Sequence, residues 1–295
     1  MMNILIAGGS GLLGSALKRS LLADGYEVFI LSRNSGGIDT IKWDGLTTKG
    51  WGHRINEMDA VIHITGRSTA VWPWTASRKK SLEDSRILPG LALVQAIREA
   101  NHRPSLFVQF SGINYYGLRG DLADESTPPG DDFLARLTVK WEDATRAVEE
   151  YGIRRLVLRT SVVLARENPL MLLMSLPVKM FVGGRIGSGK QAFPWIHIKD
   201  WVGATRHLMA DKKARGVYNL IAPVQTSLEA FSRELAQTLH RPYWFPLPDF
   251  LMRNVLGEMG VMILDGRFSQ PKRLLESGYQ FQFPGPREAL ADLYG

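Results

Sequence analysis

Three glycines near the start of the chain have the spacing of a pyrophosphate-binding turn. Gly8, Gly11 and Gly14 directly follow the apolar run of residues 4–7. In a strand, glycine turn and helix, the first glycine permits the tight turn, the second lets backbone approach phosphate oxygens, and the third lets the helix pack closely. The N-terminus of that helix then directs free N–H groups at the anion. The pattern therefore predicts a dinucleotide site within residues 1–40.

The end of the second apolar run indicates which dinucleotide binds. Chains that bind NAD usually place Asp or Glu about 20 residues after the glycines, where it binds the ribose 2′-hydroxyl. This chain has Ser32 and Arg33 instead, with no acid at the strand end. Arginine can pair with a 2′-phosphate through two N–H groups, and serine can donate a further hydrogen bond. We therefore predict NADP(H) as the cofactor, with an exposed arginine after a strand as the alternative.

The first half of the sequence alternates between strand and helix patterns. Apolar runs predict strands at residues 3–7, 27–31, 40–43, 60–64, 106–110 and 155–158. Apolar residues with three- and four-residue spacing predict helices between them, including one at 133–151 that ends before Gly152. This alternation predicts an α/β fold with a doubly wound, Rossmann-type parallel sheet. Its ligand is expected at the carboxyl ends of the strands.

The pattern changes after about residue 164, where prolines and glycines separate shorter segments. One more strand is expected at 217–220 and helices at 227–239 and 250–264. We therefore expect two domains. Residues 1–165 would form the Rossmann NADP(H)-binding domain, and residues 166–295 a smaller, mixed C-terminal substrate-binding lobe. Part of 196–222 would return to the Rossmann core.

Composition narrows the classes of partner. Lys and Arg number 36 against 29 Asp and Glu, a net charge of +7, but the basic residues form only short groups. We therefore expect attraction of anionic metabolites and no nucleic-acid partner. No cysteine is present, and the six histidines lack metal-ligand spacing, so no metal is expected. No signal peptide or spanning segment is apparent, which predicts a cytoplasmic protein with no membrane partner. An oligomer is left open.

Longer segments resemble a known superfamily. Residues 8–14, 59–66 and 111–117 resemble extended short-chain dehydrogenase/reductases. Further segments resemble the epimerase-like atypical branch, the nucleoside-diphosphate-sugar epimerase-like proteins; they are residues 74–79, 85–86, 132–135, 141–142, 187–191, 195–200 and 219–223. The resemblance covers nearly the whole chain. The cofactor contacts that it implies are at Gly8, Ser10, Gly11, Leu12, Leu13, Gly14, Ser32, Arg33, Ile64, Thr65, Arg86 and Val163.

Two of these regions leave alternatives open. Arg86 stands where the superfamily has an asparagine, so its fixed charge would lie near the nicotinamide ribose or a substrate carboxylate or phosphate. Its alternative is a surface salt bridge. Asp44 is either close to the adenine or a turn residue before Gly45.

The resemblance also implies a catalytic pair that this chain lacks. The superfamily uses a tyrosine with a lysine four residues later, and the ammonium lowers the pKa of the phenol. No Tyr-x-x-x-Lys occurs here, and the two positions fall on Leu134 and Thr138. The usual serine position holds Gly112, with Ser111 one residue earlier.

Ser111 and Tyr116 are therefore the candidate catalytic residues. A plain strand-end hydrogen bond and aromatic packing are their respective alternatives. His197 lies in an alternating stretch, which favours a buried histidine over a catalyst. Lys190 and Gln191, on a glycine-rich loop, are predicted to bind substrate.

Trp195 completes the predicted substrate-binding set. Together these residues predict an NADP(H)-dependent oxidoreductase or epimerase acting on a small anionic or nucleotide-sugar-like substrate. General acid–base catalysis, which the missing pair would provide, typically raises reaction rates about 10²–10⁴-fold. Its loss makes a non-catalytic NADP(H) sensor or scaffold the alternative.

Overall fold

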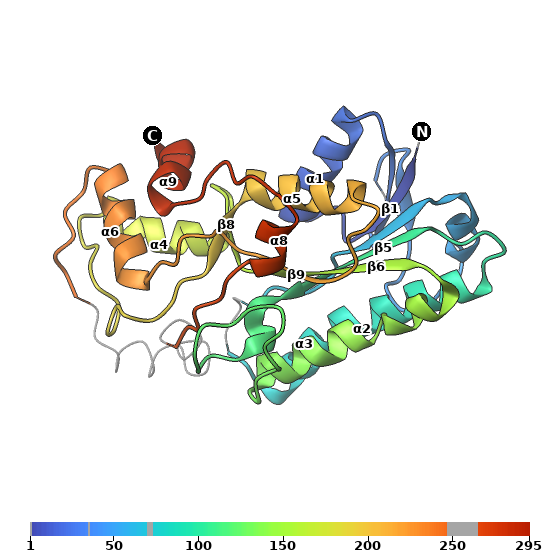
Figure 1. Ribbon diagram of the computed structural model, residues 1–295, viewed down its shortest axis with the longest axis horizontal. Helices are drawn as coiled ribbons and strands as arrows, with labels where there is room; N and C mark the ends of the chain where they lie inside the picture. Colours follow the sequence, from blue (N-terminus) through green and yellow to red (C-terminus); the bar gives the residue numbers. More distant parts are fainter. Residues whose placement is uncertain (1, 35, 70–72, 247–264) are drawn as a thin grey trace.

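A seven-stranded parallel sheet forms the centre of the protein in the computed structural model, which describes residues 2–34, 36–69, 73–246 and 265–295 (Figure 1). Its strand order is β3-β2-β1-β4-β5-β6-β9. The strands are β1 (Asn3–Ala7), β2 (Glu27–Ser32), β3 (Thr40–Lys42), β4 (Ala60–His63), β5 (Leu106–Gly112), β6 (Arg154–Thr160) and β9 (Gly216–Leu220). The α/β fold with a doubly wound parallel sheet is thus confirmed.

The strand order reverses beside β1. From β1 the chain moves outward through β2 and β3, and then returns to the other side of β1 with β4. The loops after β1 and β4 therefore diverge, and open a crevice at the carboxyl ends of these strands. This crevice positions the site described below.

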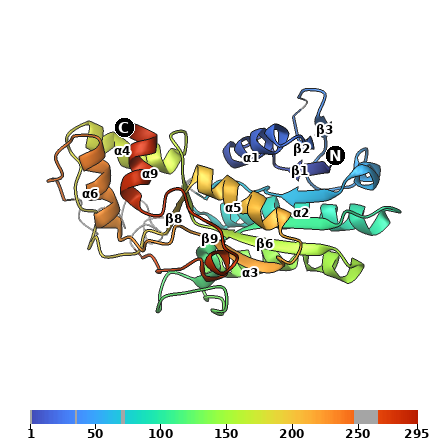
Figure 2. The same ribbon diagram turned by 45° about the horizontal axis from the view of Figure 1, so that its top comes forward.

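Both faces of the sheet are covered, which explains why its strands are continuous apolar runs. Because side chains alternate along a strand, Ile4 and Ile6 of β1 join one hydrophobic core and Leu5 and Ala7 join another. The first core lies beneath α1 (Leu12–Ala23) and α5 (Ile198–Ala210). On the other face lie α2 (Ala76–Glu99) and α3 (Phe133–Asp143) (Figures 1 and 2).

The C-terminal part of the chain forms a second group of elements beyond the end of the sheet (Figure 2). It contains the two-stranded parallel sheet of β7 and β8, with α4, α6 and α9 around it. These elements are β7 (Val162–Leu164), α4 (Pro169–Lys179), β8 (Trp195–His197), α6 (Leu228–Thr238) and α9 (Pro286–Tyr294). A further short helix, α8 (Lys272–Glu276), contacts β9. The boundary between two domains at residue 165 stays a prediction.

Buried Asp200 attaches the last part of the chain to α5. Its carboxylate accepts hydrogen bonds from the Tyr279 hydroxyl at 3.0 Å and from the backbone N–H groups of Gln282 and Phe283 at 2.8 and 2.9 Å.

In the described parts of the chain, no helix is both long and apolar enough to cross a bilayer.

The structure corrects one predicted element. The helix expected at 133–151 is interrupted: α3 ends at Asp143, and a separate 3₁₀ segment runs from Arg146 to Tyr151. At the break, the buried Thr145 hydroxyl donates to Gln109 of β5 at 3.0 Å, and such side-chain bonds compete with regular helix. The short pairing of β7 with β8 was not predicted. The helix expected at 250–264 lies outside the described residues.

Candidate functional site

The glycine turn after β1 is packed as its sequence predicts. Gly8 has a φ of +91°, and a Cβ atom there would lie 3.0 Å from the backbone of Ile64. A Cβ on Gly14 would lie 2.6 Å from the Cα of Gly9, so α1 can approach the turn only with glycine at this position. Gly11 differs, because its nearest neighbour would be 3.8 Å away. The turn therefore leaves an open approach to the N-terminus of α1.

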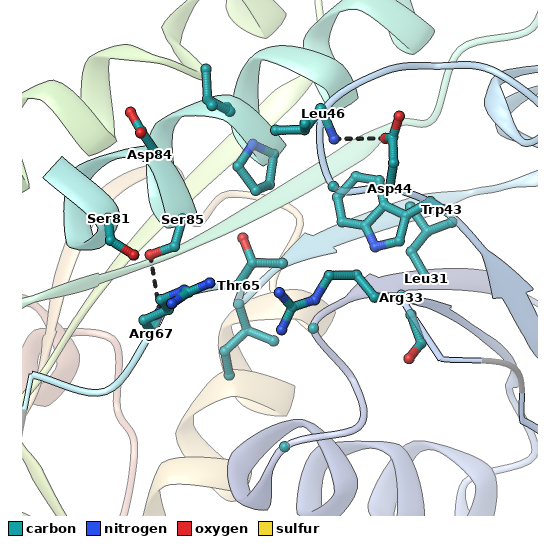
Figure 3. Close-up of a pocket in the computed structure, with 18 of the residues that line it drawn as sticks. Leu31, Arg33, Trp43, Asp44, Leu46, Thr65, Arg67, Ser81, Asp84 and Ser85 are labelled. Atoms are coloured by element: carbon teal, nitrogen blue, oxygen red, sulfur yellow. Dashed lines mark hydrogen bonds between the residues drawn. The ribbon is translucent and has the colours of Figure 1, made fainter. Parts of the chain in front are cut away.

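A cavity of about 830 Å³ opens beside this turn, at the carboxyl ends of β1, β2 and β4 (Figure 3). Five predicted cofactor residues line this cavity and not the smaller one; they are Gly8, Ser10, Gly11, Ser32 and Arg33. The side chain of Arg33 extends from the end of β2 into the cavity, toward Thr65 (Figure 3). Trp43 and Leu46, which sequence reasoning missed, complete the wall around Asp44.

More basic than acidic side chains line the larger cavity. Asp84 is paired with Lys80 at 3.2 Å, and the Asp44 carboxylate accepts the backbone N–H groups of Leu46 and Thr47. The hydroxyl and backbone N–H of Thr47 are the main reason that the pKa of Asp44 falls to about 2. Asp44 thus holds the turn and also borders the cavity. Among the described residues, Arg33 has no carboxylate within 4.0 Å, which leaves its charge available to an anion.

A smaller cavity of about 310 Å³ continues from the first, and Ile64 and Thr65 line both. Three predicted residues line it from α1, α2 and β5; they are Leu13, Arg86 and Ser111. Leu134 and Thr138, at the two positions of the missing pair, also line it. Asn114, Trp141, Thr160 and Ser161 were missed by sequence reasoning.

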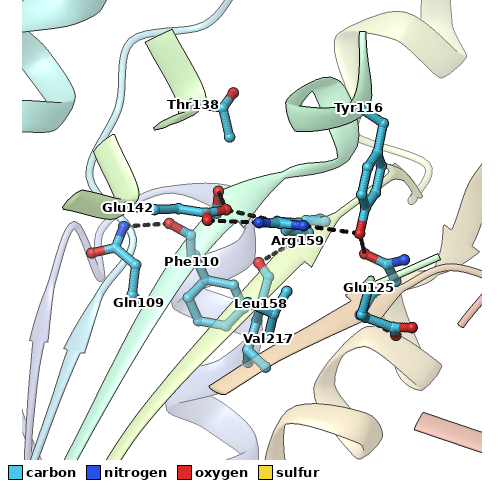
Figure 4. A network of polar contacts seen from close by, with 12 residues as sticks. Gln109, Phe110, Tyr116, Glu125, Thr138, Glu142, Leu158, Arg159 and Val217 are labelled. Carbon is cyan, nitrogen blue, oxygen red and sulfur yellow. Dashed lines mark hydrogen bonds and ion pairs between the residues drawn. The ribbon is translucent and has the colours of Figure 1, made fainter. Parts of the chain in front are cut away.

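Ser111 is held by a buried ion pair. Its hydroxyl donates to Glu142 Oε1 at 2.7 Å. The same carboxylate accepts hydrogen bonds from Nε and Nη2 of Arg159, each at 2.8 Å (Figure 4). Burial acts to lower the pKa of Arg159, but the hydrogen bonds and charge of Glu142 outweigh it and raise that pKa. Because a carboxylate only accepts hydrogen bonds, the Ser111 hydroxyl must donate to Glu142. The lone pairs of Ser111 Oγ then remain available to accept a hydrogen bond from a ligand.

Thr65 is oriented in a similar way by a buried histidine. Gln109 Nε2 donates to the Phe110 carbonyl at 2.6 Å, which turns its Oε1 toward His63 Nδ1 at 2.9 Å. Desolvation lowers the pKa of His63 to about 4, so the ring is neutral, with its hydrogen on Nδ1. His63 Nε2 must then accept the Thr65 hydroxyl at 2.6 Å. Thr65, like Ser111, therefore offers only lone pairs to the cavity.

Tyr116 lies behind this site. Its hydroxyl accepts a hydrogen bond from Arg159 Nη1 at 3.0 Å (Figure 4). The hydroxyl also donates to Asn219 Oδ1 at 2.8 Å, and the side chain lines neither cavity. Desolvation is the main cause that raises the pKa of Tyr116 to about 12. Because it is buried and has both partners, its position does not support the predicted proton transfer.

The remaining predicted residues line neither cavity. Val163 is buried in β7, and Thr160 and Ser161 border the smaller cavity instead. Gln191 and Trp195 are buried, with Gln191 Nε2 bonded to the Ile186 carbonyl. The substrate contacts predicted for Lys190, Gln191 and Trp195, and the cofactor contacts predicted for Leu12 and Val163, stay predictions. His197 is fully buried, as expected for a core histidine.

The parallel sheet, the glycine turn and the cavity at its switch point define a dinucleotide-binding α/β protein. The chain matches the NAD dependent epimerase/dehydratase family over residues 4–220, and it belongs to that family. It is an epimerase-like atypical short-chain dehydrogenase/reductase, which confirms the resemblance. Residues 247–293 match a domain of unknown function, DUF1731.

Relatives extend over the full length of the chain. It is 37% identical over 299 residues to epimerase family protein SDR39U1 of Bos taurus, with 99% of both chains covered. It is 31% identical over 301 residues to epimerase family protein YfhF of Bacillus subtilis, with 99% and 98% covered. The crystal structure of human epimerase family protein SDR39U1 (isoform2) with NADPH superimposes with a TM-score of 0.91, at 34% identity, and 99% of each chain is covered.

Proposed function

We propose that this protein binds NADP(H) along the two joined cavities and acts as an oxidoreductase or epimerase on a small anionic or nucleotide-sugar-like substrate. The observation that carries the proposal is the continuity of the site. A glycine turn with an uncompensated arginine lies at one end, and the Ser111 hydroxyl with its buried acceptor, Glu142, lies at the other. Ile64 and Thr65 join the two parts.

The residues present fit NADP(H). Glycine at positions 8 and 14 lets the turn pack tightly against β4 and α1, and the open space at Gly11 lets the backbone approach a pyrophosphate. Ser32 and Arg33 would hold the 2′-phosphate. That the human relative was crystallised with NADPH supports this assignment. When bound, the nicotinamide would supply or accept the hydride that the reaction needs.

Ser111 and Glu142 would take over the proton transfer from the missing pair. Because the Ser111 hydroxyl donates its hydrogen bond to Glu142, Ser111 Oγ can accept a hydrogen bond from a substrate hydroxyl. As the substrate C–O bond becomes a carbonyl, that proton moves to Ser111 Oγ, and the Ser111 proton moves to Glu142 Oε1. Leu134, which cannot transfer a proton, would serve only as an apolar wall.

Calorimetry with NADPH and NADH tests the cofactor assignment. Wild-type protein should bind NADPH more tightly, and Arg33→Ala should lose about 10- to 100-fold of its NADPH affinity, because charged hydrogen bonds contribute about 1.5–3 kcal/mol. Arg19→Ala, an exposed position on α1, serves as the control. Equal wild-type affinity for the two dinucleotides would contradict the assignment.

The catalytic assignment is tested by NADPH-linked turnover on a panel of carbonyl compounds and nucleotide sugars. Ser111→Ala should lower turnover about 10²–10⁴-fold with NADPH affinity unchanged. Full turnover in Ser111→Ala would contradict proton transfer through Ser111 and Glu142.

A second candidate is a non-catalytic NADP(H) sensor. It is favoured by the apolar Leu134 and the neutral Thr138 at the positions of the missing pair. In this case NADPH would change the solution scattering profile or oligomeric state without any turnover. Identical profiles with and without NADPH would exclude it.

A further inference from the structure

We propose that the smaller cavity binds a small hydroxy acid, with Arg86 as the counter-ion of its carboxylate and Ser111 as the acceptor of its hydroxyl. This inference rests on the proposed function, whose substrate class it makes specific.

Arg86 is a cation without a carboxylate partner. Its Nη1 donates to the carbonyl of Leu82 at 3.0 Å and its Nη2 to that of Arg67 at 2.9 Å. No carboxylate of the described chain lies within 4.0 Å of it. Burial, with a smaller contribution from Arg78, lowers the pKa of Arg86 to about 10, so the side chain stays charged at neutral pH. A partly buried charge in this setting is unfavourable until an anion joins it.

Trp141 supplies a buried donor beside Arg86. The Arg86 guanidinium lies 5.1 Å from the centre of the Trp141 ring, and both side chains line the smaller cavity. The indole Nε1 is buried and has no hydrogen-bond partner in the described chain. Buried donors without partners are rare and need an explanation. A carboxylate can accept hydrogen bonds from a guanidinium and an indole together.

Two hydroxyls that line the cavity can only accept a hydrogen bond from a ligand. Ser111 and Thr65 have committed their hydrogens to Glu142 and His63, so each can only accept from a ligand. A substrate hydroxyl is a donor of the required kind. The volume of about 310 Å³ is the liquid volume of roughly ten water molecules, part of which the nicotinamide would take. The ligand is therefore a compound of few carbons that carries both a carboxylate and a hydroxyl.

The placement of Arg86 favours substrate over cofactor as its partner. Arg86 lines the smaller cavity and not the larger one that contains the glycine turn and Arg33. The competing role is a contact with the cofactor's nicotinamide ribose. Loss of the Arg86 charge would weaken substrate binding in the first role and NADPH binding in the second.

The experiment uses calorimetry on full-length protein saturated with NADPH, titrated with 2-, 3- and 4-hydroxybutyrate and with the three matching hydroxybutyramides. At least one acid should bind about tenfold more tightly than its amide, as expected for a charge-assisted pair. Arg86→Gln should remove this preference and keep NADPH affinity. Arg98→Gln, an exposed arginine on the same helix, should change neither.

Trp141→Phe keeps an aromatic side chain but removes the N–H, and should weaken binding of the preferred acid severalfold. This variant tests the inference even if Arg86→Gln does not fold. Equal binding of acids and amides, no binding of any acid, or a preference that survives Arg86→Gln would overturn it. Loss of NADPH affinity in Arg86→Gln would assign Arg86 to the cofactor instead. If wild-type protein does not bind NADPH at all, it is the proposed function that fails.

Discussion

Replacing Glu142 with glutamine tests the buried network behind the site. In wild type the carboxylate accepts one hydrogen bond from Ser111 and two from Arg159, whose side chain is only 4% exposed. Glutamine keeps one acceptor oxygen, but its NH₂ group must face a donor. The Arg159 charge would then remain buried without an anion.

The expected cost follows from that unpaired charge. Removing one member of a buried ion pair costs about 3–5 kcal/mol. An unfolding entropy of about 2.1 cal/mol/K per residue over 295 residues gives a fall in Tm of about 5–8 °C. Glu149, the partner of Arg155, is 52% exposed, and Arg155 also donates to the Thr145 hydroxyl and the Glu142 carbonyl. Glu149→Gln should therefore cost only about 0–1 kcal/mol.

Thermal and denaturant unfolding, followed by tryptophan fluorescence, would measure both variants. A double variant, Glu142→Leu with Arg159→Met, should recover much of the lost stability, because apolar residues can replace a buried pair at little cost. If Glu142→Gln is no less stable than Glu149→Gln, the buried network does not hold the site as described. If it is unstable and the double variant is equally so, packing and not charge is responsible.

Two further predictions concern the glycine turn and the buried histidine. The pKa of His63 is about 4 when folded and about 6.5 when unfolded, so only the unfolded chain gains the proton between these values. The free energy of unfolding should therefore fall by about 3 kcal/mol as the pH drops from about 7 to 4. Denaturant unfolding of His63→Gln should show a smaller fall over the same range. Equal falls in the two proteins would show that other groups cause the pH dependence. Gly14→Ala should lose about 1–3 kcal/mol of unfolding free energy, because its Cβ would meet the Gly9 backbone at 2.6 Å. Gly11→Ala should keep its stability but should bind NADPH more weakly in calorimetry. A fully stable Gly14→Ala would show that the turn is looser than its geometry indicates.

The sequence by itself identified the cofactor end of the site because the signals there are local. Gly8, Gly11 and Gly14 lie within seven consecutive residues, and Ser32 ends the next strand with Arg33 directly after it. Parallel strands bring their carboxyl ends to one edge, so these residues could be placed together from strand order alone. The apolar runs fixed the strands for the same reason, since a sheet buried on both faces needs them.

Sequence reasoning was weaker where side chains meet from distant segments. The neighbours of Ser111 and Tyr116 are 31 and 103 residues away, at Glu142 and Asn219. Hydrogen-bond partners of this kind have no sequence spacing. The burial of Tyr116 behind the site bears on its two alternatives, and no sequence spacing indicates that burial.

The sequence thus determined the sheet, the glycine turn and the absence of a Tyr-x-x-x-Lys pair. Only the tertiary structure decided that Glu142 orients Ser111, that His63 orients Thr65, and that Arg86 lies beside Trp141 without a carboxylate. The physical reason is that backbone turns and apolar faces are set by neighbouring residues. The direction of a hydroxyl or the isolation of a charge depends on every element packed around it.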